Sequence, residues 1–404
     1  MLHADDLRDR MPTAVLEVDS DALPDGLTVP APYERAVILV RWRGTPVGQI
    51  VLPVHDGVIR GIRLREAVLQ ETGLTIAHRR LRETLLGDAR GASVHAATVA
   101  VCTRDRPDDL ERCLSALARL PDDGQEVLVV DSCSTGDTTR LVVERHAGLP
   151  GLRYVREQRP GLDIARNRAL REARHEIVAF TDDDAVPDAG WLRGLTRGFA
   201  NSRTLCVTGL TLPLELETEA QEVFERTNGF SRGFLPVVFD GTKQNPFLVA
   251  RIGAGVNMAL RRSVLTLVGE FDEALDAGTP THSGGDHDMF IRILKAGYRI
   301  AYEPAALSRH RHRREWDALL RAVFGYGVGV YAMLTRHLLS RDLPALGIAL
   351  GWSRSQRREL ARALLRWPGS APLDVVLAEL RGCVAGPASY FASRRRQRAL
   401  AEQP

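Results

Sequence analysis

Three short apolar runs, TVAVCT at 98–103, EVLVVD at 126–131 and EIVAFT at 176–181, decide the fold of this chain. Each run is typical of a buried strand, and segments with helical apolar spacing lie between them. The intervening elements are expected to be helices at 108–120, 137–146 and 162–173 and a further strand at 152–155. Strands that alternate with helices at this spacing predict an α/β fold with a mostly parallel sheet and helices on both faces.

The predicted strands end on polar or acidic residues. Thr103-Arg104-Asp105-Arg106 follows the first strand, Asp131 closes the second, and Asp182-Asp183-Asp184 follows the fourth. Because ligands of such sheets bind beyond the carboxyl ends of the strands, these residues are expected to share one rim. Acidic residues at three such ends predict a functional site there.

An additional segment precedes the α/β unit. Residues 1–92 predict a small α+β module, in which AVILVRW at 36–42 and VGQIVL at 47–52 are expected to pair as strands. Residues 64–86 have helical apolar spacing, and 86–93 contain small and flexible residues typical of a linker.

A third segment follows the α/β unit, which is expected to cover 96–315. Residues 316–404 are mostly helical in pattern, and glycines at 325, 327 and 329 either weaken a helix there or allow close packing. The overall expectation is an α/β core with a small N-terminal α+β module and a helical C-terminal segment.

The composition is that of a globular protein, with 44% hydrophobic and 26% charged residues among 404. Lysine and arginine exceed aspartate and glutamate by 54 − 51 = 3, which is too small an excess to predict nucleic-acid binding. Five cysteines without a CxxC pair argue against a disulfide framework or a zinc ribbon and fit a reducing cytosol.

Neither a signal peptide nor a spanning helix is predicted. The start, MLHADDLRDRMP, lacks an apolar stretch, and the longest late apolar run, Leu343–Trp352, has about half of the ~20 residues that a bilayer span needs. We therefore expect a cytoplasmic protein. Peripheral membrane contact is the alternative to a solvated basic tail, because the last segment combines apolar patches with arginine clusters such as Arg394, Arg395, Arg396 and Arg398.

The carboxylates of Asp182, Asp183 and Asp184 are the sharpest feature. Three adjacent carboxylates repel one another, so burying them is costly without a cation. Hard divalent ions such as Mg²⁺ or Mn²⁺ prefer oxygen ligands of this kind. The alternative is a solvated acidic turn that leads into a helix capped by Asp188.

Two further clusters accompany the triplet. GLDIARN at 161–167 opens a helix, and its Arg166 could pair with a phosphate or an aspartate or could form an ordinary surface ion pair. GGDHD at 284–288 places Asp286 in a loop before a helix expected at 288–296, where it could act as a general base. Downstream, His310 could complete a metal site, although a histidine among arginines is usually a surface residue.

Competing signatures are missing from the sequence. It contains no GxxxxGK[ST] phosphate loop, no GxSxG elbow and no HExxH motif. Gly253-Ala254-Gly255 lacks the third glycine of a dinucleotide site and does not follow the first strand. These signatures therefore favour none of the corresponding enzyme classes.

Six motifs taken in order resemble a family 2 glycosyltransferase of GT-A fold, and they span about 96–315, a little over half the chain. They are TVAVCTRDRP, EVLVVDSCSTGDT, GLDIARNRAL, IVAFTDDDAVP, GAGVNMALRRSVLTLVGEFDEAL and GGDHDMFIRILKAGYRIAYEP. The resemblance implies inverting transfer of a sugar from a nucleotide-diphosphate donor, most often a UDP-sugar, with Mn²⁺ or Mg²⁺ as cofactor.

The resemblance also implies roles for single residues. Residues assigned to the nucleotide sugar are Thr103, Arg104, Asp131, Arg166, Asp182 and Asp183. Asp184 is implied as a metal ligand together with Asp182 and His310, with His312 as the rival histidine. Asp286 is implied as the catalytic base. The chain departs from the family pattern at Gly285, where many members have glutamate.

The chemistry of these residue types agrees with that assignment. A metal that bridges two phosphates stabilises a departing nucleoside diphosphate, and one carboxylate on the opposite face can take the acceptor proton. The stretch 213–247, which contains Phe224, Phe230, Phe234 and Phe239 and ends on Phe247, could form an acceptor loop or lid or could pack in the core.

Two other functions stay open, namely a nucleotidyltransferase that acts on sugar phosphates and a non-catalytic nucleotide-sugar-binding protein. The acceptor could be a glycan, a lipid-linked molecule or a small natural product, and nucleic acid is not expected. The first segment could recognise the acceptor or form a homodimer.

Overall fold

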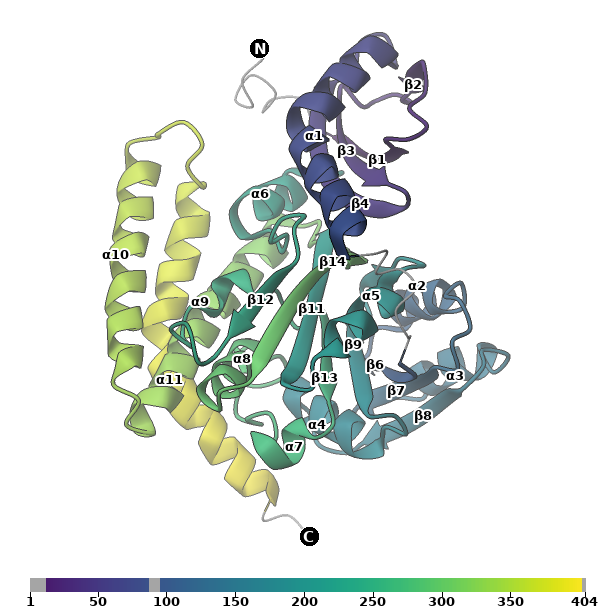
Figure 1. The fold of residues 1–404 in the computed structure, drawn as a ribbon. Coiled ribbons are helices and arrows are strands. Elements are labelled where there is room, and N and C mark those ends of the chain that lie inside the picture. Colours follow the sequence, from purple (N-terminus) through teal and green to yellow (C-terminus); the bar gives the residue numbers. More distant parts are fainter. Residues whose placement is uncertain (1–11, 87–94, 402–404) are drawn as a thin grey trace.

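The computed structural model describes residues 12–86 and 95–401, and Figure 1 shows a small upper module, a central sheet and a set of long helices on one side. The linker expected at 86–93 lies outside the described residues, apart from Leu86 at the end of the first helix.

The N-terminal module is a three-stranded sheet covered by one helix. Its elements are β1 (Thr13–Asp19), β2 (Gly26–Thr28), β3 (Arg35–Trp42), β4 (Thr45–Pro53), β5 (Val58–Arg60) and α1 (Gly61–Leu86). The expected hairpin forms at Arg43-Gly44. Both residues have positive φ values, 50° and 75°, as in the two-residue turns whose twist matches that of the paired strands. Strand β1, which the sequence reading overlooked, runs parallel to β3.

The four strands expected from the sequence form one parallel half of the central sheet, in the order β9-β6-β7-β8. Their bounds, with those of the helices that connect them, are β6 (Ala97–Thr103), α2 (Pro107–Leu117), β7 (Glu126–Ser132), α3 (Thr138–Arg145), β8 (Leu152–Glu157), α4 (Leu162–Glu172) and β9 (Ile177–Asp182). The α/β class is thereby confirmed.

The other half of the sheet was not resolved into strands by sequence patterning. It consists of β10 (Ala185–Pro187), β11 (Thr204–Pro213), β12 (Val237–Asp240), β13 (Asn257–Arg261) and β14 (Arg299–His310). Strand β13 runs antiparallel to β9 and β11, whereas β11 and β14 are parallel. The helices of this half are α5 (Trp191–Arg197), α6 (Glu219–Asn228), α7 (Val264–Leu267) and α8 (Gly285–Lys295).

One pairing in this half positions the acidic triplet. Strand β10 lies antiparallel to β14, with Ala185 opposite His310. The end of β9 and the end of β14 therefore meet at one rim. Asp188 does not cap a helix, because α5 begins only at Trp191 and the Asp188 carboxylate pairs instead with Arg41 at 2.7 Å.

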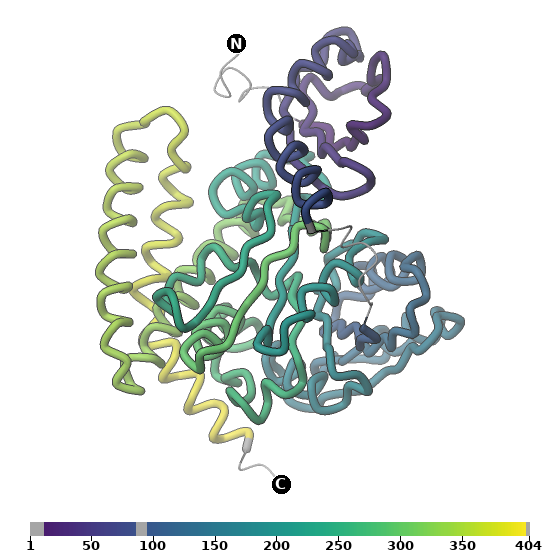
Figure 2. Tube along the Cα trace, viewed as in Figure 1, coloured from purple at the N-terminus to yellow at the C-terminus, as the bar shows by residue number. Residues whose placement is uncertain are grey.

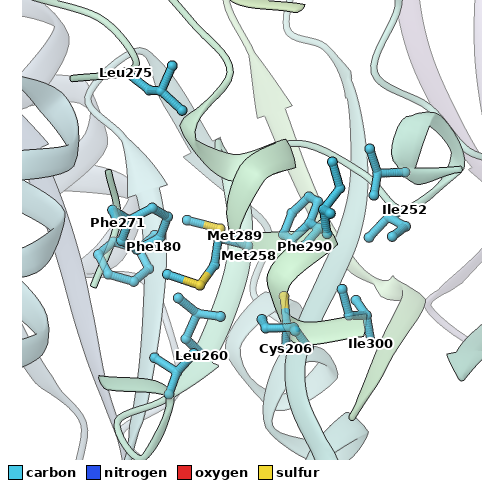
Figure 3. Packing of buried hydrophobic residues seen from close by; sticks show 14 of the residues in the cluster. Phe180, Cys206, Ile252, Met258, Leu260, Phe271, Leu275, Met289, Phe290 and Ile300 are labelled. Carbon is cyan, nitrogen blue, oxygen red and sulfur yellow. The ribbon is translucent and has the colours of Figure 1, made fainter. Parts of the chain in front are cut away.

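The main core lies beneath this rim. Phe180 of β9, Met258 of β13 and Ile300 of β14 pack with Met289 and Phe290 of α8, all of them buried (Figure 3). Aromatic and thioether side chains of this size fix the position of α8 against the sheet, because burying each contributes about 1.5–3 kcal/mol. The first turn of α8 is therefore held at the rim by its own apolar face.

Three long helices complete the chain: α9 (Trp316–Leu339), α10 (Pro344–Leu364) and α11 (Leu373–Ala401). In Figure 2 they stand on the side of the sheet away from β8. The expectation that no helix could span a membrane overlooked α9. By its length and composition alone α9 could cross a bilayer, but 50% of its most apolar 18-residue stretch is buried inside the protein. Its buried residues pack against α8 and α11.

Glycines bring α9 and α11 together. A Cβ atom on Gly327 would lie 2.3 Å from the carbonyl oxygen of Glu379, and one on Gly382 would lie 2.1 Å from that of Phe324. Close packing, rather than a weakened helix, therefore explains the glycines at this crossing.

We expect Gly327→Ala to lower the free energy of unfolding by about 1–3 kcal/mol, because the added methyl group forces the two backbones apart. Gly347→Ala in α10 is the matched control: no atom lies within 4 Å of its Cβ position, so it should stabilise the protein by about 0.5–1 kcal/mol. Urea titration followed by circular dichroism measures both. Equal effects of the two variants would contradict this account.

Candidate functional site

A cavity of about 970 Å³ opens at the carboxyl ends of β6 and β9. Thr103 and Asp182 reach it from the sheet, Asp286 from α8, His310 from the end of β14, and Tyr326 from α9. The topology thus brings together most of the residues that sequence analysis singled out.

The three carboxylates of the acidic triplet differ in their hydrogen-bond and ion-pair partners. Asp183 points into the protein: its Oδ2 accepts from the Thr103 hydroxyl at 2.7 Å and its Oδ1 accepts from Arg106 at 2.6 Å. Burial, partly offset by Arg106, raises the pKa of Asp183 to about 7. Both oxygens are thus engaged within the protein, which suits a residue that positions the loop.

Asp184 lies among two arginines and a histidine. Arg106 donates to its Oδ2 at 2.8 Å, Arg313 lies 3.4 Å from the same oxygen, and His310 Nε2 lies 3.3 Å from Oδ1. Burial disfavours the charged form, but His310 and then the arginines outweigh it and hold the pKa of Asp184 well below its usual range. Asp184 is therefore ionised at neutral pH.

Asp182 has the opposite environment. Within the described ranges its carboxylate makes no hydrogen bond or ion pair, although it lines the cavity. Burial and then the charge of Asp184 raise the pKa of Asp182 to about 6. A cation in the cavity would relieve that repulsion.

The residues present fit a divalent ion. Asp184 Oδ1 is buried, with His310 Nε2 as its neighbour at 3.3 Å, and Asp182 lines the same cavity. Between residues 12 and 86 and from 95 to 401, no group of three histidine, cysteine or acidic side chains forms a complete ligand set. Two carboxylates without a closed cage are typical of Mg²⁺ or Mn²⁺, which keep waters and phosphate oxygens as their other ligands.

Of the two rival histidines, His310 is the one that faces the acidic pair. His312 is 3% exposed, and its Nε2 lies 2.9 Å from a carboxylate oxygen of Glu225. Burial lowers the pKa of His312, so it stays neutral against the ring of Phe224. Phe224, from the stretch expected to be a loop or a core element, packs in α6 and lines the cavity.

The prediction that Asp286 lies in the loop before the helix is wrong, since α8 begins at Gly285 and Asp286 belongs to its first turn. Its Oδ2 accepts from the Gly255 amide and its Oδ1 from the His287 amide, both at 2.7 Å. Burial opposes ionisation, but His287, Arg166 and these amides outweigh it and lower the pKa of Asp286. The carboxylate is ionised and rigidly held.

Asp288, expected near a helix cap, lies deeper in the same helix. It is fully buried, and its carboxylate accepts from Arg292 at 2.8 Å and pairs with Arg336 of α9 at 2.9 Å. It therefore ties α8 to the C-terminal helices rather than serving the cavity.

Arg166 is buried under the cavity and not on the surface. Its Nη1 donates to Asp163 at 3.0 Å and to Asp276 at 2.7 Å. The pairing with Asp163 is of the kind expected from the sequence, in which Arg166 could bind a neighbouring aspartate, whereas Asp276 was missed because it lies in a loop whose pattern carried no signal. Burial raises the pKa values of Asp163 and Asp276, and their mutual repulsion adds to the shift at Asp163.

The glycine at 285 has a structural cause. A Cβ atom there would lie 1.8 Å from Asp163 Oδ2, an oxygen that is buried and has no hydrogen-bond partner. Asp163 thus fills the space beside Asp286 that a side chain at 285 would need. Gly285 and Asp163 therefore form one arrangement, in which the carboxyl group of Asp163 takes the space of a Cβ atom at 285.

Two expected residues stand apart from the cavity centre. Asp131 is fully buried, and its carboxylate accepts from the Tyr154 hydroxyl at 2.6 Å and the Ser134 amide at 2.9 Å, so it does not line the cavity. Arg104 lines the rim and is about two-fifths exposed, 3.7 Å from Asp105.

Comparisons with known proteins agree with this geometry. Residues 98–268 match the model of the family described as "Glycosyl transferase family 2". A pre-mycofactocin glycosyltransferase of Mycobacterium tuberculosis is 28% identical over 318 residues, 72% of this chain and 63% of that protein. The succinoglycan biosynthesis protein ExoM of Rhizobium meliloti is 28% identical over 213 residues, 52% of this chain and 64% of that protein. The chain thus spans a little under two thirds of the length of these relatives.

A solved structure shares the fold. The mannosyltransferase PcManGT from Pyrobaculum calidifontis, in complex with GDP-Man and Mn²⁺, aligns with a TM-score of 0.51 and 19% identity over 77% of this chain and 93% of its own. This likeness, which covers more than the matched family region, supports the GT-A architecture of the central sheet.

We expect Gly285→Ala to reduce turnover at least tenfold, because its methyl group displaces Asp163 and with it the first turn that carries Asp286. Asp163→Gly in the same chain removes the obstacle and should restore part of the lost turnover. Turnover rates measured for the single and double variants test this prediction. If the losses of the two single variants simply add in the double variant, residues 163 and 285 do not compete for the same space.

Proposed function

Because residues 98–268 match the model of glycosyl transferase family 2, we propose that this chain is a member of that family and transfers a sugar from a nucleotide-diphosphate donor to an acceptor hydroxyl group with inversion. The observation that carries the proposal is the meeting of Asp182, Asp184 and His310 with Asp286 in one cavity.

We propose that Asp182, Asp184 and His310 hold Mn²⁺ or Mg²⁺. The PcManGT complex contains Mn²⁺ with a nucleotide sugar on the same fold, which supports a divalent ion here. When bound, the ion offsets the negative charge that grows on the departing diphosphate. Arg106 and Arg313, which already face Asp184, add positive charge on the same side of the cavity.

The donor lies between the strand ends and α4 in this proposal. Thr103, Arg104 and Arg166 border the cavity there, and a UDP-sugar is the donor we favour. Asp183 supports Thr103 and Arg106 from below. Asp131 acts indirectly, because it fixes the Ser134 amide in the turn that follows β7.

Asp286 is proposed as the general base. Its ionised carboxylate can accept the proton of the acceptor hydroxyl while that oxygen attacks the anomeric carbon and the bond to the diphosphate breaks. A single base on α8, set apart from the acidic pair at the end of β9, favours attack from the face opposite the leaving group and hence inversion.

The acceptor side of the cavity is lined by Phe230, Tyr326 and Trp352. Such rings can stack on a sugar, a lipid-linked glycan or a small natural product, and the names of the relatives refer to products as different as pre-mycofactocin and succinoglycan. Nucleic acid is not proposed as a partner. The reaction is expected to take place in the cytoplasm, where nucleotide sugars are used.

A nucleotidyltransferase that acts on sugar phosphates is the second function. It would use the same acidic pair but would release pyrophosphate instead of a nucleoside diphosphate. Identifying the released product therefore distinguishes the two functions.

Asp286→Asn should lower the transfer rate by about 10²–10⁴-fold while donor binding stays unchanged, because the amide cannot take a proton. The control is Asp317→Asn, at an exposed aspartate in the first turn of α9. Release of nucleoside diphosphate in the presence of acceptor measures the rate. A rate for Asp286→Asn close to that of the control would remove Asp286 as the base.

At saturating Mn²⁺, which keeps the carboxylate of Asp182 ionised, the wild-type rate should stay level as the pH falls from neutral toward 5. Since the pKa of Asp286 lies below its ordinary value of 3.8, the base remains ionised across that range and loses its proton-accepting form only at lower pH. Initial rates at saturating donor and at two Mn²⁺ concentrations measure the profile. A decline that begins near pH 6 and does not shift when Mn²⁺ is raised would indicate a different base.

Asp184→Asn should abolish the part of nucleoside-diphosphate binding that depends on Mn²⁺, whereas Asp188→Asn, just after β10 and paired with Arg41, should preserve it. Calorimetry with UDP and GDP, each with and without Mn²⁺, measures the effect. Undiminished synergy between metal and nucleotide in Asp184→Asn would contradict the assigned ligand.

A further inference from the structure

The outer side of α10 combines exposed leucines with arginines. Leu343, just before the helix, is 74% exposed, Leu346 and Leu350 are each 51% exposed, and Leu365 after the helix is 74% exposed. Their spacing places them on one side of a helix. Together with Arg354, Arg357 and Arg358 they form what we call the α10 face.

The opposite side of α10 is already covered. Ala345, Gln356 and Ala363 are buried, and Gln356 donates to Glu379 of α11 at 2.8 Å. In Figure 1, α10 is the outermost element of its side of the molecule, and α11 and α9 lie between it and the sheet. The apolar side chains of the α10 face thus have no counterpart within the described part of the chain.

The charged residues of α10 are mostly positive. Residues 344–364 contain four arginines and a single acid, Glu359, which lies 3.3 Å from Arg362. Arg354, Arg357 and Arg358 have no carboxylate within 4.0 Å in the described ranges. By contrast, Arg63 and Arg65 of α1, a helix that also exposes leucines, pair with Glu66 and Asp25.

We propose that the α10 face docks this protein on an anionic lipid bilayer. A helix that carries leucines with unpaired arginines and lies flat can bury its apolar side chains in the headgroup region while the arginines contact lipid phosphates. Trp367, 56% exposed just beyond the helix, adds an aromatic ring of the kind that prefers the membrane interface.

A second copy of the chain suits this face less well. In a symmetric dimer the same patch meets itself, which would bring the unpaired arginines of both copies together without acids to neutralise them. An anionic surface supplies the missing charge. The chemistry of the face therefore favours phospholipid headgroups over self-association.

The position of the face also relates to the cavity. Trp352 of α10 and Glu379 of α11 line the cavity that holds Asp286. A protein docked through α10 would therefore keep its cavity beside the bilayer. Delivery of a lipid-linked acceptor to that cavity rests on the proposed function, whereas docking itself does not.

Co-sedimentation of the full chain with vesicles tests the proposal. Vesicles of phosphatidylcholine mixed with phosphatidylglycerol should bind the protein, with an affinity that falls as salt rises, and vesicles of phosphatidylcholine alone should bind it at least tenfold more weakly. Leu346→Ser/Leu350→Ser and Arg354→Gln/Arg358→Gln should each weaken binding by about tenfold or more.

Matched controls come from other surfaces. Leu74→Ser removes an 89% exposed leucine from α1, and Arg119→Gln removes an exposed arginine after α2; neither should change vesicle binding. Donor turnover without vesicles should be unchanged in all four variants, which separates failed docking from a failed catalytic assignment. Thermal unfolding confirms that each variant is folded.

Three results would overturn the proposal. They are absence of binding to anionic vesicles, binding that the α10 variants leave intact, and a wild-type dimer in sedimentation equilibrium that the α10 variants convert to monomer. The last result would assign the face to a second copy of the chain.

Discussion

The repulsion among carboxylates gathered at one rim of the sheet is the constraint on which the site depends. Asp182, Asp183 and Asp184 leave β9 together, and the chain resolves their repulsion by giving each a different environment. Asp183 turns inward to Thr103, Asp184 is surrounded by Arg106, Arg313 and His310, and Asp182 is left facing the cavity with a pKa raised to about 6. A cation in the cavity would relieve the repulsion at the carboxylate left without a partner.

A second cluster of carboxylates lies deeper in the cavity, and there too each carboxylate has its own partners. Arg166 is shared by Asp163 and Asp276, while Asp286 is held by backbone amides at the start of α8. Gly285 allows Asp163 to reach this position, because any side chain there would meet its carboxyl oxygen. The two groups differ in what balances their charge: arginine side chains do so at the rim, whereas backbone amides and Arg166 do so below. Asp286 is therefore rigidly held, whereas the carboxylate of Asp182 is left facing the cavity.

The sequence predicted those parts of the fold that depend on local pattern. The apolar strands β6, β7 and β9 and the helices between them carry strong periodic signals, and the acidic triplet follows one of them directly. Strands β11, β13 and β14 were missed because they pair over long distances and are connected irregularly. Asp276 was missed for the same reason, since only the tertiary fold brings it to Arg166. The start of α8 was misjudged because glycines, which usually interrupt helices, here begin one.

Anomalous diffraction from crystals soaked with Mn²⁺ and a nucleoside diphosphate tests the central claim most directly. The account predicts a manganese peak within ligand distance of Asp184, with Asp182 or His310 beside it and diphosphate oxygens completing the coordination. A manganese peak remote from the end of β9, or a diphosphate bound by the arginines alone with no metal near Asp184, would contradict it.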